Sequence, residues 1–404
     1  MCFSYCPSFP ALFDAIDAHE KKGEGETAAL TEAEIDRTVD LCFQCKLCYV
    51  NCPYVPGQSE WAIDFPRLML RAGAMRHARR DVSRRRRLTE NVMGRTDLLG
   101  KLSSRAAPAV NAVTRRRGGV VRSVLAQTAG ISSERLLPPF ARRRFTTWFN
   151  QRPRVRMERP QGKVTVFPTC LVEYQAPSVG HDLVRVYERN GIECDVSYPG
   201  CCGAPFLHGG DVEHFERAAA ANVKVLADAV RAGTDIVVPQ PTCSYTLRKD
   251  YVDYAGGADA DLVAAHTFDA AEYLMRVHQG ETTSLDLDFP GDVPETVTYH
   301  TPCHVRAQGI GLKSRDLMKL TGARVRLVQQ CSGIDGMWGL RDENADRSLA
   351  VSRKLGDEIT RAGGEVVAGD CHLANTAITE QTGRLPVHPL QVMARAYGIA
   401  EERG

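Results

Sequence analysis

The feature that most constrains the fold of this chain is an internal repeat of cysteines, each close to a predicted strand end. Three sites recur at offsets of 133, 130 and 128 residues: Cys170 with Cys303, Cys201-Cys202-Gly203 with Cys331-Ser332-Gly333, and Cys243 with Cys371. The carboxyl ends of strands in an open α/β sheet are where ligands bind. The repeat therefore predicts two copies of one α/β unit, each with a group of thiols at one sheet edge.

The hydrophobic pattern supports this division, because predicted strands alternate with predicted helices in both copies. In the first copy we expect strands at 164–167, 194–198 and 235–239 and helices at 182–190 and 212–231. In the second copy we expect strands at 296–300, 324–329 and 365–368 and helices near 314–320 and 343–361. The prediction is two pseudo-repeated α/β cysteine-rich domains, copy one at residues 161–282 and copy two at residues 283–404.

Residues 1–66 carry the most specific cysteine motif of the chain. Cys42-x2-Cys45-x2-Cys48-x3-Cys52-Pro53 has the spacing with which bacterial ferredoxins hold [4Fe–4S] clusters, the fourth cysteine binding a neighbouring cluster. Zinc is the main alternative, but zinc sites usually pair Cys-x2-Cys units that lie further apart. We predict a small α-helical two-cluster ferredoxin-like head, in which Thr31-Glu-Ala-Glu34 opens a helix that runs towards Leu41.

Only half of a second ferredoxin motif is present. Cys2-x3-Cys6-Pro7 matches the last two cysteines and the proline of the motif, which predicts two missing ligands upstream of Met1 and an apparently truncated head. We expect Cys6 to complete one cluster with Cys42, Cys45 and Cys48, while Cys2 and Cys52 belong to the other. The alternative is that the chain begins here and has lost one cluster.

The fourteen cysteines must also be weighed against the compartment in which the chain works. No run approaches 18 apolar residues and residues 1–10 do not resemble a signal peptide, so we expect a cytoplasmic protein. In a reducing compartment, metal ligation is a better explanation of the cysteines than disulfides. Cys194 matches neither cysteine pattern and is expected to be a buried strand residue.

The net charge of +2 conceals a basic segment at residues 67–160, which holds 24 Arg or Lys and five acidic residues, a net of +19. Helical spacing at Leu98–Val113, interrupted by Pro108, predicts a basic helical linker or docking segment. We expect this segment to dock on a partner subunit or on an anionic membrane surface. The simpler alternative is that it forms a solvated, partly disordered arm. The arginine run Arg84–Arg87 could bind phosphate groups, but we expect no nucleic-acid partner because the sequence contains no motif that recognises bases. Neither G-x-G-x-x-G nor a P-loop indicates a nucleotide cofactor.

The two cysteine-rich copies resemble the CCG domain pair found in the B subunit of heterodisulfide reductase. The whole order of segments is closer still to the family formed by the C subunit of anaerobic glycerol-3-phosphate dehydrogenase, which also places a two-cluster head before the pair. The segments that carry the likeness are Tyr299–His304, Cys331–Gly336, Thr242–Arg248 and Asp370-Cys371, with Leu98–Leu102, Ala107–Asn111 and Phe145–Trp148 in the middle region.

The heterodisulfide reductase pattern offers five cysteines in each copy for a non-cubane [4Fe–4S] cluster, and this chain departs from it. Thr246 replaces the fifth cysteine of copy one, and copy two has Ser332 and Ala374 at two of its positions. The resemblance implies one cluster held by the four copy-one thiols, Cys170, Cys201, Cys202 and Cys243. In copy two, Cys303, Cys331 and Cys371 either use a fourth ligand such as His304 or His372 or are vestigial buried thiols.

The family resemblance implies an iron–sulfur electron-transfer subunit that passes electrons from a partner flavoprotein dehydrogenase towards quinone. It also implies a peripheral place on the inner face of the cytoplasmic membrane. The alternatives are a heterodisulfide-reductase-like enzyme that reduces a disulfide or persulfide at a cluster, and a zinc scaffold without redox function. No catalytic residue is identified, and the electron donor is left open because substrate choice would lie on another chain.

Overall fold

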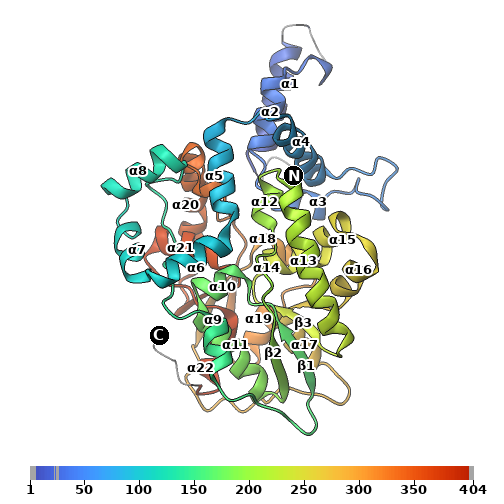
Figure 1. Ribbon diagram of the computed structural model, residues 1–404, viewed down its shortest axis with the longest axis vertical. Helices are drawn as coiled ribbons and strands as arrows, with labels where there is room; N and C mark the ends of the chain where they lie inside the picture. Colours follow the sequence, from blue (N-terminus) through green and yellow to red (C-terminus); the bar gives the residue numbers. More distant parts are fainter. Residues whose placement is uncertain (1–5, 22, 24–26, 400–404) are drawn as a thin grey trace.

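The computed structural model describes residues 6–21, 23 and 27–399. The N-terminal head lies at one end of the long axis, the two α/β copies form the body, and the helices of the basic segment run along one side (Figure 1). No helix of the described residues is long and apolar enough to cross a membrane.

Copy one is built on a parallel sheet in the order β2-β1-β3-β4. Its strands are β1 (Gly162–Val166), β2 (Ile192–Val196), β3 (Asp235–Val238) and β4 (Thr267–Asp269). The predicted strands are confirmed within one or two residues, whereas β4 was not predicted because it is only three residues long. Helices α11 (Pro177–Arg189), α13 (Val212–Arg231), α16 (Gly257–Ala265) and α17 (Ala270–His278) complete the copy.

Copy two repeats this arrangement with a three-stranded parallel sheet in the order β6-β5-β7. The strands are β5 (Thr296–His300), β6 (Arg324–Val328) and β7 (Val366–Gly369), and the main helices are α19 (Lys313–Lys319), α20 (Ala345–Ala362), α21 (His372–Thr382) and α22 (Pro389–Ala396). In both sheets the first strand of the copy lies in the middle, with the second strand on one side and the third on the other. The internal repeat read from the cysteines is thus a repeat of the fold.

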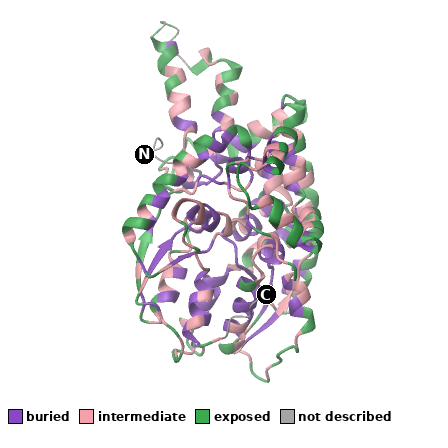
Figure 2. Ribbon diagram, turned by 90° about the vertical axis from the view of Figure 1, so that its left-hand side faces the viewer, coloured by how far each residue is buried: buried purple, intermediate pink, exposed green. Residues whose placement is uncertain are grey.

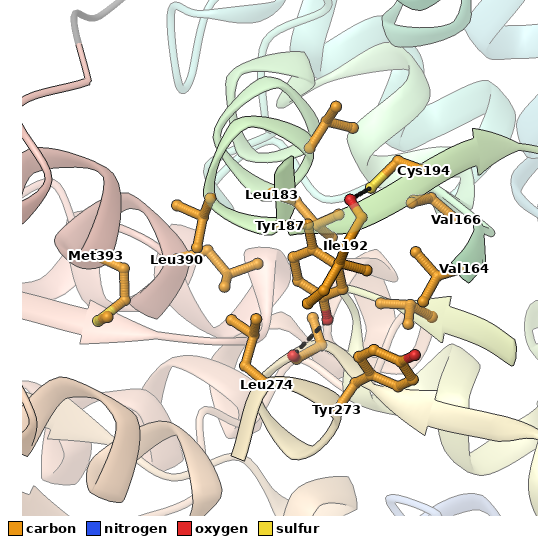
Figure 3. Packing of buried hydrophobic residues seen from close by; sticks show 14 of the residues in the cluster. Val164, Val166, Leu183, Tyr187, Ile192, Cys194, Tyr273, Leu274, Leu390 and Met393 are labelled. Carbon is orange, nitrogen blue, oxygen red and sulfur yellow. Dashed lines mark hydrogen bonds between the residues drawn. The ribbon is translucent and has the colours of Figure 1, made fainter. Parts of the chain in front are cut away.

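One apolar core joins the two copies. Leu183 and Tyr187 of α11 pack with Leu274 of α17 and with Leu390 and Met393 of α22 from copy two (Figure 3). Cys194 lies in the same cluster and is 3% exposed, so the prediction of a buried strand residue is confirmed. Burial concentrates in the first sheet, in β5 and β7, and in the helices beside them, whereas β6 is mostly exposed and the outer helices carry exposed faces (Figure 2).

The head consists of helices α1 (Ser8–Glu20), α2 (Glu32–Asp40) and α3 (Leu47–Val50), and α4 (Phe65–Arg79) leads into the basic segment. The capping box predicted at Thr31 is present, with Thr31 Oγ1 accepting from Glu34 N and the Glu34 carboxylate accepting from Thr31 N. These helices agree with an α-helical head, whereas a two-cluster ferredoxin fold stays a prediction. Cys2 lies outside the described residues.

The basic segment is folded against the rest of the chain rather than extended as a disordered arm. It forms α5 (Arg84–Gly94), α6 (Thr96–Arg105), α7 (Ala107–Thr114), α8 (Val120–Ala129) and α9 (Phe145–Gln151), and Pro108 falls at the start of α7 as expected. Ten of its arginines pair with acidic residues outside the segment: Arg67, Arg76, Arg85, Arg86, Arg117, Arg135, Arg144, Arg152, Arg154 and Arg156. The charge division of the sequence is therefore partly neutralised within the molecule.

Some of these ion pairs tie the head to copy two through the basic segment. Asp40 Oδ1 at the end of α2 lies 2.8 Å from Arg76 Nη1 and 2.7 Å from Arg86 Nη1. Arg86 Nε also bonds Glu90, which in turn contacts Arg341 of copy two at 3.1 Å. The Asp40 carbonyl accepts from the Trp338 indole at 2.6 Å, so the cysteine loop of the head is held against copy two.

Candidate metal centres

The four copy-one thiols converge at the carboxyl edge of the first sheet, as the sequence predicts. Cys170 lies in α10 (Thr169–Tyr174) after β1, Cys201 and Cys202 precede α12 (Ala204–His208), and Cys243 lies in α14 (Pro241–Tyr245) after β3. Cys202 Sγ is 3.3 Å from Cys243 Sγ, and Cys201 Sγ is 3.9 Å from Cys170 Sγ. Three separate segments, one after each of β1, β2 and β3, thus bring four thiols into one apolar cluster.

Hydrogen bonding gives these thiols different pKa values. Bonds from the Cys170 and Cys202 thiols, with further donors at Thr96 and Gly203 N, hold the pKa of Cys201 well below its ordinary value. The bond to Cys201 raises the pKa of Cys170, and burial adds to that effect. The thiolate form of Cys201 is therefore favoured by its hydrogen bonds, and the thiolate is the form that binds metal.

The glycine of each copy has a structural cause that the sequence did not reveal. Gly203 has φ +86° and a Cβ there would lie 2.9 Å from Phe215 Cδ2; Gly333 has φ +68° and a Cβ there would lie 2.6 Å from Ser348 O. Both glycines follow the cysteine site and meet the next long helix of their copy. A left-handed turn packed against a helix accounts for the glycine in both copies.

Asp97 of α6 was not predicted as part of the site, yet it reaches into copy one. Its Oδ2 accepts from Cys201 N at 2.7 Å, and Oδ1 accepts from the hydroxyls of Tyr198 and, at 3.4 Å, Tyr174. Burial and the neighbouring Cys201 raise the pKa of this carboxyl. The sequence shows Asp97 as an isolated acid among basic residues, but it does not show that Asp97 contacts Cys201.

The three copy-two cysteines also meet at a strand edge. Cys303 begins α18 (Cys303–Ala307) after β5, Cys331 follows β6, and Cys371 precedes α21. Burial is the main cause of the raised pKa of Cys303, and the charges of Cys331 and Cys371 contribute to it. Burial raises the pKa of Cys331 and of Cys371 to about 11.

The two histidines considered as a fourth ligand have different surroundings. His304 Nδ1 lies 3.6 Å from Cys303 Sγ but also 3.2 Å from Thr242 Oγ1 of copy one. His372 Nε2 is buried and has no hydrogen-bond partner among the described residues, and burial lowers the pKa of this imidazole to about 4. His300 is a buried core residue whose Nε2 lies 2.9 Å from Gln330 O.

In the head, the C-x2-C-x2-C loop curls through two non-glycine residues with positive φ, Gln44 at 53° and Lys46 at 62°. Such residues are uncommon and mark a constrained loop. Burial is the main cause of the raised pKa of Cys42, and the charges of Cys6 and Cys48 contribute to it. Cys52 follows the short helix α3, and its amide donates to Tyr49 O at 3.1 Å.

The three thiol groups adjoin one another in a series. Cys45 packs in one apolar cluster with Cys6 of the head and with Cys303 and Cys331 of copy two. The charge of Cys243 in copy one contributes to the raised pKa of Cys371, after burial as the main cause. Contacts between Thr242 and His304, and between Gln308 Nε2 and Ser244 Oγ at 2.9 Å, join the two copies at the same place. The head cysteines therefore adjoin copy two, which comes after copy one in the chain.

The donor chemistry of these groups fits iron–sulfur clusters. Soft thiolates with apolar surroundings suit iron–sulfur clusters and zinc, and the head holds three closely spaced cysteines on a loop with two left-handed residues. Within residues 6–21, 23 and 27–399, no three His, Cys, Asp or Glu side chains are grouped tightly enough to hold a single metal ion. A site for a larger polynuclear cluster does not require that grouping.

Comparison with known families identifies the domain class. The cysteine-rich domain family CCG matches residues 164–248 and 297–377, the two regions that carry the repeated cysteines. Each of the two copies therefore contains one match to the cysteine-rich domain model, in agreement with the predicted resemblance.

Comparison with individual proteins extends the similarity beyond these domains. The chain is 29% identical to the C subunit of anaerobic glycerol-3-phosphate dehydrogenase of Escherichia coli, over 89% of this chain and 99% of that protein. It is 26% identical to the B subunit of fumarate reductase (CoM/CoB) of Methanothermobacter marburgensis, over 59% of this chain and 47% of that protein. It is also 26% identical to an uncharacterised iron–sulfur protein of Methanococcus maripaludis, over 50% and 38% of the two chains.

These similarities, with the cysteine-rich domains, make the chain an iron–sulfur, metal-binding component of oxidoreductase electron transport. Two of the similar proteins are subunits of a dehydrogenase and of a reductase.

Proposed function

We propose that the chain is an electron-transfer subunit that passes electrons singly between a partner flavoprotein dehydrogenase and quinone. The observation that carries the proposal is a series of contacts between the thiol groups. Cys45 of the head packs with Cys303 and Cys331 of copy two, and His304, next to Cys303, lies 3.2 Å from Thr242, next to Cys243 of copy one. The similar dehydrogenase subunit of Escherichia coli supports a dehydrogenase as the partner. The substrate of that partner is not specified by this chain.

Three [4Fe–4S] sites are proposed within the described residues. Cys6, Cys42, Cys45 and Cys48 would hold the head cluster; Cys170, Cys201, Cys202 and Cys243 the copy-one cluster; and Cys303, Cys331 and Cys371 the copy-two cluster. Cys52, with Cys2, would belong to a further head cluster. When bound, each cluster accepts and releases one electron at a time.

The surrounding residues keep the thiols dry and oriented. Cys201, Cys202 and Cys243 are all buried, none of them more than 8% exposed, and Asn222 Nδ2 donates to Cys201 O at 2.9 Å. Burial raises the pKa of Cys42 and of Asp250, and the charge of the buried Lys46 partly offsets that rise. A buried cation beside negatively charged thiolates reduces the cost of burying their charge.

His372 is the better candidate for the fourth ligand in copy two. Its Nε2 is buried without a partner among the described residues, whereas His304 Nδ1 is within hydrogen-bond distance of Thr242. A buried neutral imidazole is a suitable ligand, as in the clusters where histidine replaces cysteine and raises the reduction potential.

Iron and acid-labile sulfide counts on anoxically purified protein test the ligand sets. We expect Cys243→Ala and Cys371→Ala each to lose one cluster's worth of iron, while Cys194→Ala, also a buried thiol, keeps the wild-type count. The low-temperature EPR spectrum of the reduced protein should lose one component in each ligand variant. An unchanged iron count in Cys371→Ala would show that copy two is vestigial, and zinc in place of iron would contradict the redox function.

We also propose that the basic segment docks on an anionic membrane surface through α6–α8. Its exposed large apolar residues include Leu98 and Leu102 on α6 and Val120, Val121 and Val124 on α8, with Val120 82% exposed. Lys101, Arg105, Arg115 and Arg116 lie on or beside these helices, are exposed and have no ion-pair partner among the described residues. An apolar face flanked by cations suits the interface of an anionic bilayer.

Co-sedimentation with vesicles that contain phosphatidylglycerol tests this surface. Val120→Glu/Val124→Glu should abolish binding, because it places two acids on the face, whereas Val225→Glu on the exposed side of α13 should leave binding unchanged. Binding that survives in the double variant, or that is equal for neutral vesicles, would contradict docking through α8.

A further inference from the structure

We propose that Gln44 and Lys46 are positioning residues that act through the Cys42 sulfur and raise the reduction potential of the head centre. This role rests on the head cluster of the proposed function, but it does not depend on the direction of electron flow or on the identity of the partner. Both residues lie inside the Cys42-x2-Cys45-x2-Cys48 loop. Each is only 5% exposed, although glutamine and lysine are mostly surface residues.

The backbone of the loop makes both positions costly for a residue with a side chain. Gln44 has φ 53° and Lys46 has φ 62°, in the left-handed region that glycine adopts freely and other residues adopt only at a conformational cost. Glycine at either position would avoid that cost. The two strained positions therefore point to a role for the side chains that they carry.

The hydrogen bonds of this pair run in one direction. Lys46 Nζ donates to Gln44 Oε1 at 2.8 Å, and an ammonium group can only donate. The Gln44 amide must therefore turn its oxygen to Lys46 and its NH2 group away from it. Gln44 Nε2 donates to Cys42 Sγ at 3.3 Å and to Pro66 O at 3.4 Å. A buried cation is thus joined to a proposed cluster ligand by two consecutive hydrogen bonds.

The Lys46 charge has no acidic partner at hydrogen-bond distance. In the part of the chain that the structure describes, Nζ has Gln44 as its one hydrogen-bond acceptor and forms no ion pair. The nearby buried carboxyl of Asp250 has a pKa that burial raises and the Lys46 charge lowers. A buried ammonium group without a counter-ion is costly. Negatively charged thiolates of the loop would supply that counter-ion.

Lys46 also lies where the head meets both copies. Its Nζ is 5.8 Å from the ring centroid of Tyr245, two residues after Cys243 of copy one. The Tyr245 ring is in turn 5.3 Å from the ring of His304, next to Cys303 of copy two. A buried cation stabilises the more negative, reduced form of a neighbouring centre, because the interior screens charge less than water does. Lys46 would therefore favour the arrival of an electron at this junction.

An EPR-monitored redox titration of the anoxically purified full chain tests the proposal. Lys46→Gly removes the cation and leaves a residue that adopts φ 62° freely. We expect the reduction equilibrium constant of the head component to fall about ten-fold or more, which is about 59 mV for a one-electron couple. The head component is identified as the EPR signal that Cys45→Ala removes.

Three further variants separate the causes. Lys46→Arg keeps the charge and should shift the midpoint potential much less than Lys46→Gly does. Gln44→Gly keeps the cation but removes the hydrogen bond to Cys42 Sγ, and it should shift the potential in the same direction as Lys46→Gly. Arg37→Gln removes an exposed charge of α2, which water and salt screen, and should leave the potential unchanged.

An unchanged potential of the head component in Lys46→Gly, or an equal shift in Arg37→Gln, would overturn the proposal. If Lys46→Gly loses the head component, Lys46→Gln gives the same loss of charge while a polar side chain is kept. Loss of the component from both variants would assign Lys46 to assembly of the centre and overturn the effect on potential. A wild-type protein without a head component would instead contradict the proposed function, and this inference with it.

Discussion

Replacement of Gly203 by alanine should destabilise copy one by about 2–5 kcal/mol. The residue has φ +86°, and a left-handed conformation costs an L-residue roughly 1–2 kcal/mol. The added Cβ would lie 2.9 Å from Phe215 Cδ2 and 3.3 Å from Ala218 Cβ. Phe215 is fully buried, so it cannot move aside freely, and overpacking of this kind costs roughly a further 1–3 kcal/mol.

Gly233 provides a matched control that separates the two costs. Its φ is +89°, and a Cβ there would meet nothing within 4 Å. Gly233→Ala should therefore show only the conformational cost of about 1–2 kcal/mol. Urea unfolding of the anoxically prepared proteins, followed by near-UV circular dichroism, measures both variants under the same conditions.

A double-mutant cycle with Phe215→Leu tests the cause directly. If the clash with Phe215 is responsible, Gly203→Ala should cost about 1–2 kcal/mol less in the Phe215→Leu background. The iron count should follow stability in all four proteins. An additive cycle, together with iron loss in Gly203→Ala at unchanged stability, would refute this reasoning and assign the glycine to close approach of a cluster.

Two further predictions follow from buried charges. Glu380→Gln should lower the free energy of unfolding by about 3–5 kcal/mol, because Arg135, 1% exposed and 3.0 Å from Glu380, loses its partner. Glu213→Gln removes an acid from an exposed pair and should lower the free energy of unfolding by less than about 0.5 kcal/mol. Equal losses in the two variants, measured by urea unfolding, would contradict this prediction. Burial lowers the pKa of His388. When the pH is lowered through about 6.5, the imidazole is therefore protonated in the unfolded chain but not in the folded one, and the free energy of unfolding should decrease as the pH falls. His388→Asn, which can still cap α22, should flatten this fall; an unchanged slope would show that His388 does not contribute.

Local patterns predicted much of the fold correctly. Strand β5 and helix α13 were placed at their observed limits, because alternating apolar residues and the Asp211 cap act over a few residues. The order of strands in copy two repeats that in copy one, as the cysteine offsets imply. Strand β4 was missed because three residues carry too little periodicity to be recognised.

The site was predicted less completely than the fold. The four copy-one thiols were grouped from their repeat, but Asp97 was not linked to Cys201, which is 104 positions away in the sequence. The basic segment was expected to dock elsewhere or remain solvated. In the structure, ten of its arginines pair with acids of the head and of the two copies, including Arg86 with Asp40.

By itself the sequence determined which residues are able to ligate and which units fold, because thiolate chemistry, cysteine spacing and hydrophobic periodicity are local properties. Only the tertiary structure decided which groups are neighbours. The head cysteine Cys45 packs with Cys303 and Cys331 of copy two, about 260 to 290 positions later in the chain. It also decided that Arg86 serves an internal ion pair while Arg87 lines a cavity. Such choices depend on packing and burial between distant segments, which no local pattern records.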